Sequence, residues 1–395
     1  STTKLTESRV FVVYVKASRL YGMICEVNGM EITILINKDI TSCTNVDGMP
    51  PVSTVALSEN KVLIAYTTGR RTNSNVRTWM VACQITENDL ILGTPTNFSS
   101  YEGECSNISM EALSENKAFM ACNGYTAYAH LYGCVITLNG LTITFGTAVA
   151  LASHIYAGKA ISIAVLSDNK VIVTHMSDNM YRLNAVVCLI SNTEITVGSN
   201  TVLNSTNYTG FNFSVVALSD SKAIIIYNIT DNSNGNSGKD NLYAMICSIS
   251  LTTISIEKNI ELISNNSATT NMYPPKALLL KNNRIAIICG RNTCLTLIFC
   301  SINNDKVEIL NQIQLSEVNY SATNLSALLL SDSRFFTAHS MSGVLWGNLC
   351  DTDEKTYICK LEQVSDKILG VAQKKGADGQ IIPVIVPNFN IKEEI

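Results

Sequence analysis

One short sequence motif recurs seven times along this chain of 395 residues, and it constrains the fold more than any other feature. In its second copy the motif reads L-S-E-N-K-V, starting at Leu57. The copies begin at Leu5, Leu57, Leu113, Leu166, Leu218, Leu280 and Leu330, and successive leucines lie 50 to 62 residues apart. Self-similarity at such a period indicates a repeat architecture, in which each copy is one supersecondary unit packed against its neighbours.

A column of cysteines gives each repeat a second landmark. One cysteine follows each motif leucine by 20 to 29 residues, and these are Cys25, Cys83, Cys134, Cys188, Cys247, Cys300 and Cys350. We expect them to fill one equivalent, buried strand position. The chain has thirteen cysteines and no C-x-x-C pair, so the sequence favours free thiols and folding in a reducing compartment.

The apolar segments have the length of strands. Only 15% of the residues are charged, yet no apolar run reaches the roughly 18 residues that a membrane span needs. In the second repeat, four strands are predicted at Val52–Leu57, Val62–Thr67, Arg77–Thr86 and Leu90–Thr94. Sheets whose two faces are both covered by neighbouring sheets would bury these apolar residues. The sequence therefore predicts an all-β fold, a seven-bladed β-propeller with four-stranded antiparallel blades.

The C-terminal part of the chain is predicted to close this ring. The first motif begins at Leu5, which leaves little chain for an innermost strand of the first blade. We expect residues 368–372 to supply that strand, so that the propeller covers residues 1–373 and has no open sheet edge. An open solenoid is the competing arrangement and would need polar terminal caps. Residues 374–395 are expected to form a last strand, Ile381–Val386, and a polar tail.

Two kinds of connection alternate along each repeat, and they predict where a ligand binds. The first and third are short and uniform, whereas the second and the inter-blade links vary, and a meander places the two kinds at opposite ends of the sheet. Binding residues concentrate on variable loops. The candidates there are Tyr101, Tyr156, Tyr208, Tyr273, Tyr320, Arg70, Arg71 and Asn207. Tyrosine rings among Asn and Ser suit sugars, although they can also pack on the blade below. The two arginines suit a carboxylate or phosphate, or are solvated loop charges.

A further polar position follows each motif leucine by nine residues. It holds Tyr14, Tyr66, Cys122, His175, Tyr227, Cys289 and His339. Equivalent positions are spread around the axis, too far apart for one ion with bonds of roughly 2.0–2.3 Å, so we expect a buried polar layer and neither a metal nor another cofactor. The loop that begins near Asp231 starts like a calcium loop but lacks the terminal glutamate, and the sequence leaves calcium binding there open.

Signature motifs of enzymes are missing from the sequence. It contains no sialidase box, no H-E-x-x-H, no P-loop and no G-x-S-x-G, so we expect a protein that is not an enzyme. A glycan-cleaving enzyme, the alternative, would need carboxylates at the variable end, such as Asp47, Glu102 and Glu104. The net charge of −4 and the lack of a basic stripe argue against a nucleic-acid partner.

The repeat and the C-terminal segment together resemble a known group of proteins. The L-S-[DE]-[NS]-K motif covers nearly the whole chain, and I-L-G-V-A-Q-K-K-G-A-D-G-Q-I-I-P-V-I-V-P follows from Ile368. Both resemble β-propeller tail-fibre and receptor-binding proteins of phages and phage-tail-like bacteriocins of Gram-positive, clostridial bacteria. The resemblance implies recognition of a bacterial cell-surface polysaccharide or glycoprotein, without membrane insertion.

The same resemblance implies how such a protein is assembled. It would fold in the bacterial cytoplasm, form a homotrimer, and act outside the cell in a virion or tail-like particle. A scaffold for protein–protein interaction in a tail or surface assembly is the alternative.

Overall fold

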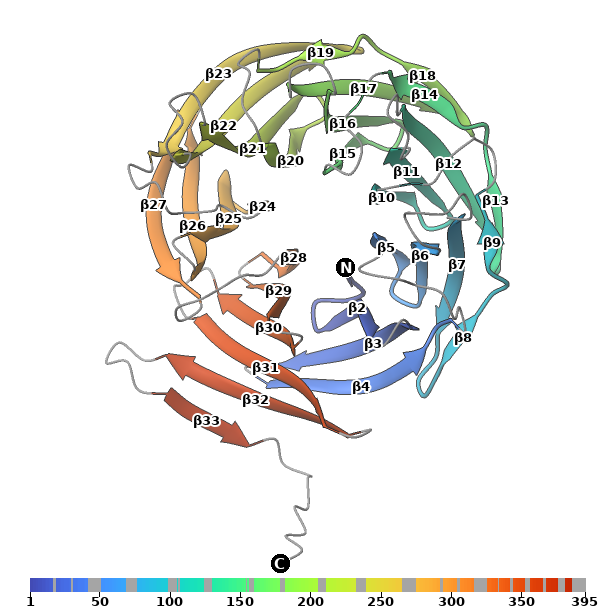
Figure 1. Cartoon of the computed structure of the whole chain (residues 1–395), viewed down its shortest axis with the longest axis vertical. Helices are drawn as coiled ribbons and strands as arrows, with labels where there is room; N and C mark the ends of the chain where they lie inside the picture. The colour runs from blue at the N-terminus through green and yellow to red at the C-terminus, as the bar shows by residue number, and fades with distance from the viewer. Residues whose placement is uncertain are drawn as a thin grey trace, which may run out of the picture.

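The protein, described by a computed structural model, is a ring of antiparallel sheets around one axis (Figure 1). The structure describes the chain except residues 17–18, 30, 42–50, 69–76, 99–104, 106, 124–129, 154, 156–159, 178–181, 205–210, 232–238, 265–274, 292–293, 304–305, 316–324, 333, 342–343, 352–355, 365–366, 376–380 and 386–395. After Cys350 it describes the strands but not their side chains. Within the described ranges there is no helix long and apolar enough to cross a membrane.

The strands follow one another in chain order, sheet by sheet. Blade 1 contains β1 (Thr2–Lys4), β2 (Arg9–Lys16), β3 (Arg19–Asn28) and β4 (Glu31–Asp39). Blade 2 contains β5 (Val52–Ser58), β6 (Lys61–Thr68), β7 (Arg77–Ile85), β8 (Leu90–Leu92) and β9 (Thr96–Asn97). Blade 3 contains β10 (Asn107–Ser114), β11 (Lys117–Asn123), β12 (Leu131–Asn139), β13 (Thr142–Phe145) and β14 (Val149–Ala152). Blade 4 contains β15 (Ser162–Ser167), β16 (Lys170–Met176), β17 (Leu183–Ser191), β18 (Glu194–Val197) and β19 (Thr201–Val202).

The remaining three blades complete the ring. Blade 5 contains β20 (Phe211–Ser219), β21 (Lys222–Asp231), β22 (Lys239–Ser250) and β23 (Thr253–Ile263). Blade 6 contains β24 (Lys276–Leu280), β25 (Arg284–Arg291), β26 (Cys294–Asn303) and β27 (Lys306–Gln314). Blade 7 contains β28 (Leu325–Ser331), β29 (Arg334–Met341), β30 (Val344–Asp351) and β31 (Thr356–Val364), followed by β32 (Lys367–Lys375) and β33 (Ile381–Ile385).

This architecture confirms the predicted seven-bladed propeller of four-stranded antiparallel sheets. In blades 2, 3 and 4 the outermost strand is broken into two pieces, and both pieces pair with the third strand. The break begins at a glycine, Gly93, Gly146 or Gly198, whose N–H still donates to the third strand. A bulge at glycine bends the strand without losing the ladder on either side.

Seven apolar clusters hold the blades together, and each lies between two adjacent blades. One example joins blades 3 and 4, where Phe119 and Val135 pack with Val173, all fully buried. Burying a side chain of this size stabilises a fold by about 1.5–3 kcal/mol. The second and third strands are buried on both faces by these clusters, which is why they carry apolar runs where an exposed sheet would alternate.

The recurring motif forms the first turn of each blade, and one hydrogen bond explains its spacing. In blade 2 the Ser58 hydroxyl donates to Asn60 at 2.9 Å, and the Asn60 carbonyl accepts the N–H of Ile85 at 2.7 Å. In five other blades the backbone carbonyl at the same motif position accepts an N–H from the third strand, and the donors are Val27, Leu138, Ile190, Ile249 and Ile302. The turn therefore ties the first hairpin to the end of the third strand.

The predicted closing strand is wrong. β1 pairs with β2 and is itself the innermost strand of blade 1, whereas β32, which contains residues 368–372, pairs with β31 at the outer edge of blade 7. β33 follows it, so this edge lies outside the ring (Figure 1). Three residues of β1 are enough for an innermost strand, because the neighbouring blades complete its contacts.

Side-by-side contacts between the first and last blades close the ring instead. The N–H of Thr2 donates to the Ser326 hydroxyl at 3.1 Å, and Arg334 donates to the carbonyl of Gly29. Apolar side chains from both blades, such as Val10 and Phe336, form one buried cluster. The closure therefore uses the same kind of interface as the other six junctions.

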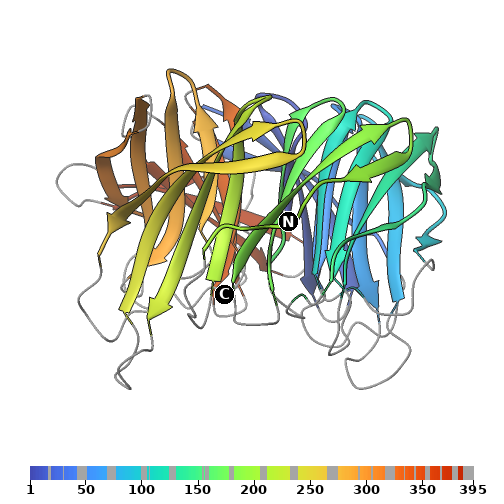
Figure 2. The same cartoon turned by 90° about the horizontal axis from the view of Figure 1, so that it is seen from above.

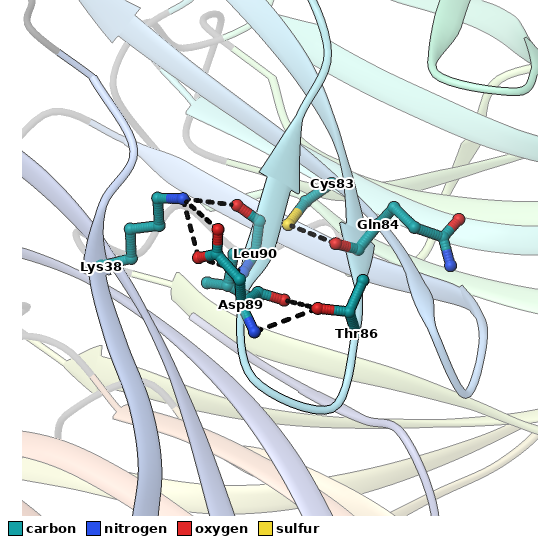
Figure 3. Close-up of polar contacts among 6 residues, drawn as sticks. All are labelled: Lys38, Cys83, Gln84, Thr86, Asp89 and Leu90. Atoms are coloured by element: carbon teal, nitrogen blue, oxygen red, sulfur yellow. Dashed lines mark hydrogen bonds and ion pairs between the residues drawn. The ribbon is translucent and has the colours of Figure 1, made fainter.

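In blades 2 to 5 the outer turn packs against the blade before it. A Cβ atom added to Gly198 would lie 2.7 Å from the Thr252 carbonyl oxygen, in the next blade's outer turn. Gly93 and Leu141, and Gly146 and Thr193, have the same relationship. Between blades 1 and 2 a charge replaces the glycine, because Lys38 reaches the turn at Asp89 (Figure 3). Glycine is required at these seams because a neighbouring backbone approaches closely.

Candidate functional site

The strand order brings all the variable connections to one end of the ring. Each second strand runs toward that end, and each inter-blade link leaves from it, while the tight turns lie at the other end (Figure 2). The predicted ligand residues Tyr101, Tyr156, Tyr208, Tyr273, Tyr320, Arg70, Arg71 and Asn207 belong to these connections and lie outside the described residues. Asp47, Glu102 and Glu104 also lie outside them. Asp231 ends β21, where its backbone pairs with Lys239.

The polar position nine residues after each motif leucine lies on the second strand, close to this variable end. Tyr66, Cys122, His175, Tyr227, Cys289 and His339 are buried there, as predicted, and Tyr14 is half-buried. Burial raises the pKa of Tyr227 to about 12 and lowers the pKa of His339 to about 4. Both side chains are therefore neutral at pH 7 and serve packing. Among the described residues, no group of His, Cys, Asp or Glu could hold a metal ion.

Partners that the sequence did not reveal hold this layer in place. The Tyr14 hydroxyl donates to Asn37 at 3.0 Å, and the Tyr227 hydroxyl donates to Asn259 at 2.9 Å. Cross-strand tyrosines stack on both rings, with centroids 5.3 Å apart for Tyr14 and Tyr21 and 5.4 Å for the pair at Tyr227. The sequence does show an asparagine in the fourth strand of each of these two repeats. It could not show that this asparagine faces the tyrosine, because a bulge in the strand pairing sets its position.

A belt of serines surrounds the axis of the ring. The residue four before the motif leucine is serine in six blades: Ser1, Ser53, Ser109, Ser162, Ser214 and Ser326. Ser53 accepts the N–H of Met110, on the next innermost strand, at 3.1 Å. Ser162 and Ser214 repeat this bond to Val215 and Ala277 at 3.1 and 3.2 Å. Each hydroxyl thus satisfies an N–H on the open edge of the neighbouring sheet.

Lys276 occupies the belt position in the sixth blade, where the other six blades have serine. Glu111 on β10 lies two residues before its motif leucine, at a position that holds Thr3, Val55, Ala164, Val216, Leu278 or Leu328 in the other blades. Both side chains are only partly exposed. Glu111 and Lys276 are therefore the only charged side chains at these two positions, and both lie on innermost strands, β10 and β24.

Burial shifts both charged groups toward their neutral forms. It raises the pKa of Glu111 to about 7, although the charge of Lys276 acts in the opposite direction. Burial also lowers the pKa of Lys276, with Glu111 opposing that shift. Among the ion pairs of the described residues, none joins the two directly. A carboxyl group with a pKa near neutrality can both donate and accept a proton at pH 7, and the pKa of Glu111 lies there.

The ten cysteines whose side chains are described are free and buried. Six of the seven landmark cysteines occupy the same position in their blades. Cys83 pairs with Val62, and Val62 lies five residues after the motif leucine. The other five cysteines also pair with the residue five after their motif leucine. Cys134 departs from the prediction, because Ile136 pairs at that position and Cys134 lies two residues earlier. Burial raises the pKa of Cys188 to about 12, so this thiol is not reactive.

No protein-family model matches the sequence, and no curated protein sequence matches it. Solved structures do match its fold. A protein from Lactobacillus plantarum shares 11% identity over 95% of this chain and 95% of its own, with a TM-score of 0.53. An α-L-arabinanase from Penicillium chrysogenum, complexed with arabinobiose, shares 10% identity over 77% of this chain and 94% of its own, with a TM-score of 0.52.

A third similar structure is an α-L-arabinofuranosidase from Fusarium graminearum bound to an iminosugar inhibitor. It shares 8% identity over 77% of this chain and 93% of its own, with a TM-score of 0.51. At these identities the likeness is one of fold.

These comparisons overturn the prediction that the protein is not an enzyme. That prediction was based on the lack of signature motifs, yet propellers of this fold include an arabinofuranosidase and an arabinanase. A propeller can assemble a site from residues on separate blades, as the placement of Glu111 and Lys276 on blades 3 and 6 illustrates. A search for local motifs is therefore no ground for excluding catalysis.

Proposed function

We propose that this protein binds a bacterial cell-surface glycan at the variable end of the ring, as the receptor-binding domain of a phage or bacteriocin tail fibre. The observation that carries the proposal is the strand order, which gathers every variable connection at one end. The sequence of these connections contains tyrosines, Asn207 and other polar residues. Aromatic rings beside hydroxyl and amide groups suit a sugar, which presents both apolar C–H faces and hydroxyls.

Two further observations support a carbohydrate ligand. A propeller of similar fold was solved in complex with arabinobiose, and the repeat motif resembles that of tail-fibre propellers. Under this proposal the protein folds in the bacterial cytoplasm and acts in a tail-like particle outside the cell, as a homotrimer. Several shallow sites multiplied by three subunits would bind a polymer far more tightly than one site alone.

Adsorption to cell walls tests the proposal. Purified protein should sediment with cell-wall polymer from a Gram-positive host, and the triple variant Tyr156→Ala, Tyr208→Ala, Tyr320→Ala should lose at least tenfold in apparent affinity. Leu251→Ala is the matched control, because Leu251 is 77% exposed and lies in a tight turn at the opposite end. Unchanged adsorption by the triple variant would reject the tyrosine sites. Capture of a tail protein without glycan binding would favour the interaction scaffold.

A specific observation favours a second function, cleavage of the bound glycan. Glycosidases use two carboxyl groups: one with a raised pKa protonates the leaving oxygen, and the other acts as nucleophile or activates the attacking water. Glu111, with a pKa of about 7, would be the acid, and Asp47, Glu102 or Glu104 of the variable connections would supply the second carboxylate. Release of reducing ends from host cell-wall polymer, and its loss in Glu111→Gln with adsorption retained, would establish this activity. Adsorption without any release in the wild-type protein would leave binding as the function.

A further inference from the structure

The serine belt is interrupted between blades 6 and 7. At five other seams, the belt serine accepts the N–H of the residue three before the next motif leucine. Besides the three bonds given above, Ser1 accepts the N–H of Thr54 at 3.2 Å, and Ser326 accepts that of Thr2 at 3.1 Å. Between blades 3 and 4 the described residues include a belt serine, Ser109, but no such bond. Only the seam between blades 6 and 7 lacks the serine itself.

Lys276 holds its belt position in the same register as the serines. It pairs with Ile288 as Ser326 pairs with Ala338, and in both blades the partner lies eight residues after the motif leucine. Residues in the same register have their Cβ atoms on the same side of the strand. For the bonded serines, that side is the one next to the following innermost strand. The side chain of Lys276 therefore leaves β24 toward β28, which lies beside it at the axis (Figure 1).

The backbone group opposite Lys276 is the N–H of Ala327. Ala327 pairs with Thr337 in the register in which Thr2 pairs with Val12, and the N–H of Thr2 donates to the neighbouring blade. The N–H of Ala327 therefore lies on the open edge of β28 that faces blade 6. Within the part of the chain that the structure describes, no side chain accepts a hydrogen bond from it.

Lysine reverses the hydrogen-bonding chemistry of this seam. A serine oxygen accepts a hydrogen bond, whereas a lysine ammonium has three donors and no acceptor. Among the described residues the ammonium of Lys276 makes no hydrogen bond and no ion pair, not even with Glu111. Two donors thus lie at a seam where the other blades place one donor and one acceptor. A negatively charged oxygen would satisfy both of them.

We propose that this seam binds an oxyanion, a phosphate or carboxylate group, between the ammonium of Lys276 and the N–H of Ala327. Charge-assisted hydrogen bonds of this kind are stronger than bonds between neutral groups. Lys276 is the first residue of β24, and the inter-blade links enter at the variable end, so the group binds at that end of the axis. For the source of the group the inference rests on the proposed function, since an anionic substituent of the bound glycan supplies it.

Thermal unfolding with inorganic phosphate tests the site, while sodium chloride holds the ionic strength constant. Phosphate in about tenfold excess over its Kd should raise the midpoint of the wild type by about 2 °C. The rise should persist in Lys306→Ser, the matched control, because Lys306 is exposed on the outer strand of the same blade. It should be lost in Lys276→Ser and Lys276→Ala. An equal rise in either Lys276 variant would overturn the proposal.

The same two variants test the geometry when no phosphate is present. Lys276→Ser returns a hydroxyl acceptor to the belt, so its midpoint should exceed that of Lys276→Ala. Equal midpoints would show that the N–H of Ala327 does not lie opposite this position, and the proposal would fail.

A backbone amide supplies a readout on the unaltered protein. In the wild type, isotopically labelled at its alanine nitrogens, the signal of Ala327 is identified by its absence from Ala327→Gly. This signal should shift when phosphate or acetate is added. A signal that stays in place at saturating concentrations of both anions would overturn the site.

Adsorption to cell-wall polymer separates this inference from the proposed function. A phosphate response without adsorption supports the oxyanion site and rejects the glycan as its source. Adsorption without a phosphate response rejects the site and leaves glycan binding. If both hold, polymer stripped of its anionic substituents should bind the wild type as weakly as intact polymer binds Lys276→Ser.

Discussion

Glu111 of blade 3 and Lys276 of blade 6 act on each other's charge across the axis of the ring without forming a direct ion pair. Each replaces an uncharged residue of the repeat, and each is partly buried. Charges in such surroundings cost stability unless they are fully paired. The pair is therefore a functional candidate with a measurable effect on stability.

The stability of the protein should fall as pH rises through the titration range of Glu111. Its pKa is about 7 in the folded protein, against an ordinary value of 4.5, so below about pH 4 both states hold the proton and the group has no effect. Between these values the folded state keeps a proton that the unfolded state has lost. The free energy of unfolding therefore falls as pH rises, by about 3 kcal/mol in total above pH 7.

Glu111→Gln should remove this dependence. Urea unfolding at pH 5 and pH 8 should show that the variant gains stability over the wild type mainly at pH 8. Lys276 is another titratable group near the axis among the described residues, so Lys276→Met is measured alongside. Asp168→Asn, in an exposed tight turn, is the control. An equal gain at both pH values would contradict the assignment.

Removing one hydroxyl of the serine belt should weaken the blade interface. Ser214→Ala leaves the N–H of Ala277 without its acceptor, and Ser214 is 6% exposed. A buried donor left unsatisfied costs about 1–3 kcal/mol. Chemical unfolding measures the loss, with the exposed Ser191→Ala as control, expected to stay within about 0.5 kcal/mol. Equal effects would show that the belt contributes nothing.

Gly198→Ala should destabilise the seam between blades 4 and 5. The new Cβ would lie 2.6 Å from the Thr252 Cβ and 2.7 Å from its carbonyl oxygen, so the turn of blade 5 must move. Overpacking of this kind costs about 1–3 kcal/mol. The midpoint of thermal unfolding should fall for this variant and hold for Ser199→Ala, one residue along and exposed. A Gly198→Ala variant as stable as the wild type would mean that the turn at Thr252 can move away from blade 4 without a loss of stability.

Leu251→Gly should stabilise the protein. Leu251 has a φ of 53° in the outer turn of blade 5, where the equivalent turns have Gly29, Gly140 and Asn192 at φ values of 59°, 60° and 56°. A branched apolar side chain in this left-handed region costs about 1–2 kcal/mol. Unfolding free energies should rise by about 1 kcal/mol, whereas Leu310→Gly, within β27, should lower them. A loss of stability in Leu251→Gly would show that the leucine makes a compensating contact.

Much of the fold could be predicted because its signals are local. The turn at Ser58–Lys61 and the apolar runs beside it recur in every blade, so the repeat number and the antiparallel hairpins could be read directly. The candidate site could not. Lys276 and Glu111 lie at unremarkable positions in the sequence, and they become a pair only because ring closure turns both innermost strands toward one axis.

The sequence by itself determined seven blades, four strands in each, and two unlike ends of the ring, since hydrophobic runs and turn residues act over a few neighbours. Only the tertiary structure decided that Thr2–Lys4 serves as an inner strand and that Ile368–Ala372 joins an outer edge. It also decided where a glycine admits a neighbouring turn. Each of these depends on contacts between blades. Such contacts join residues that are far apart in the chain, so they produce no periodic pattern in the sequence.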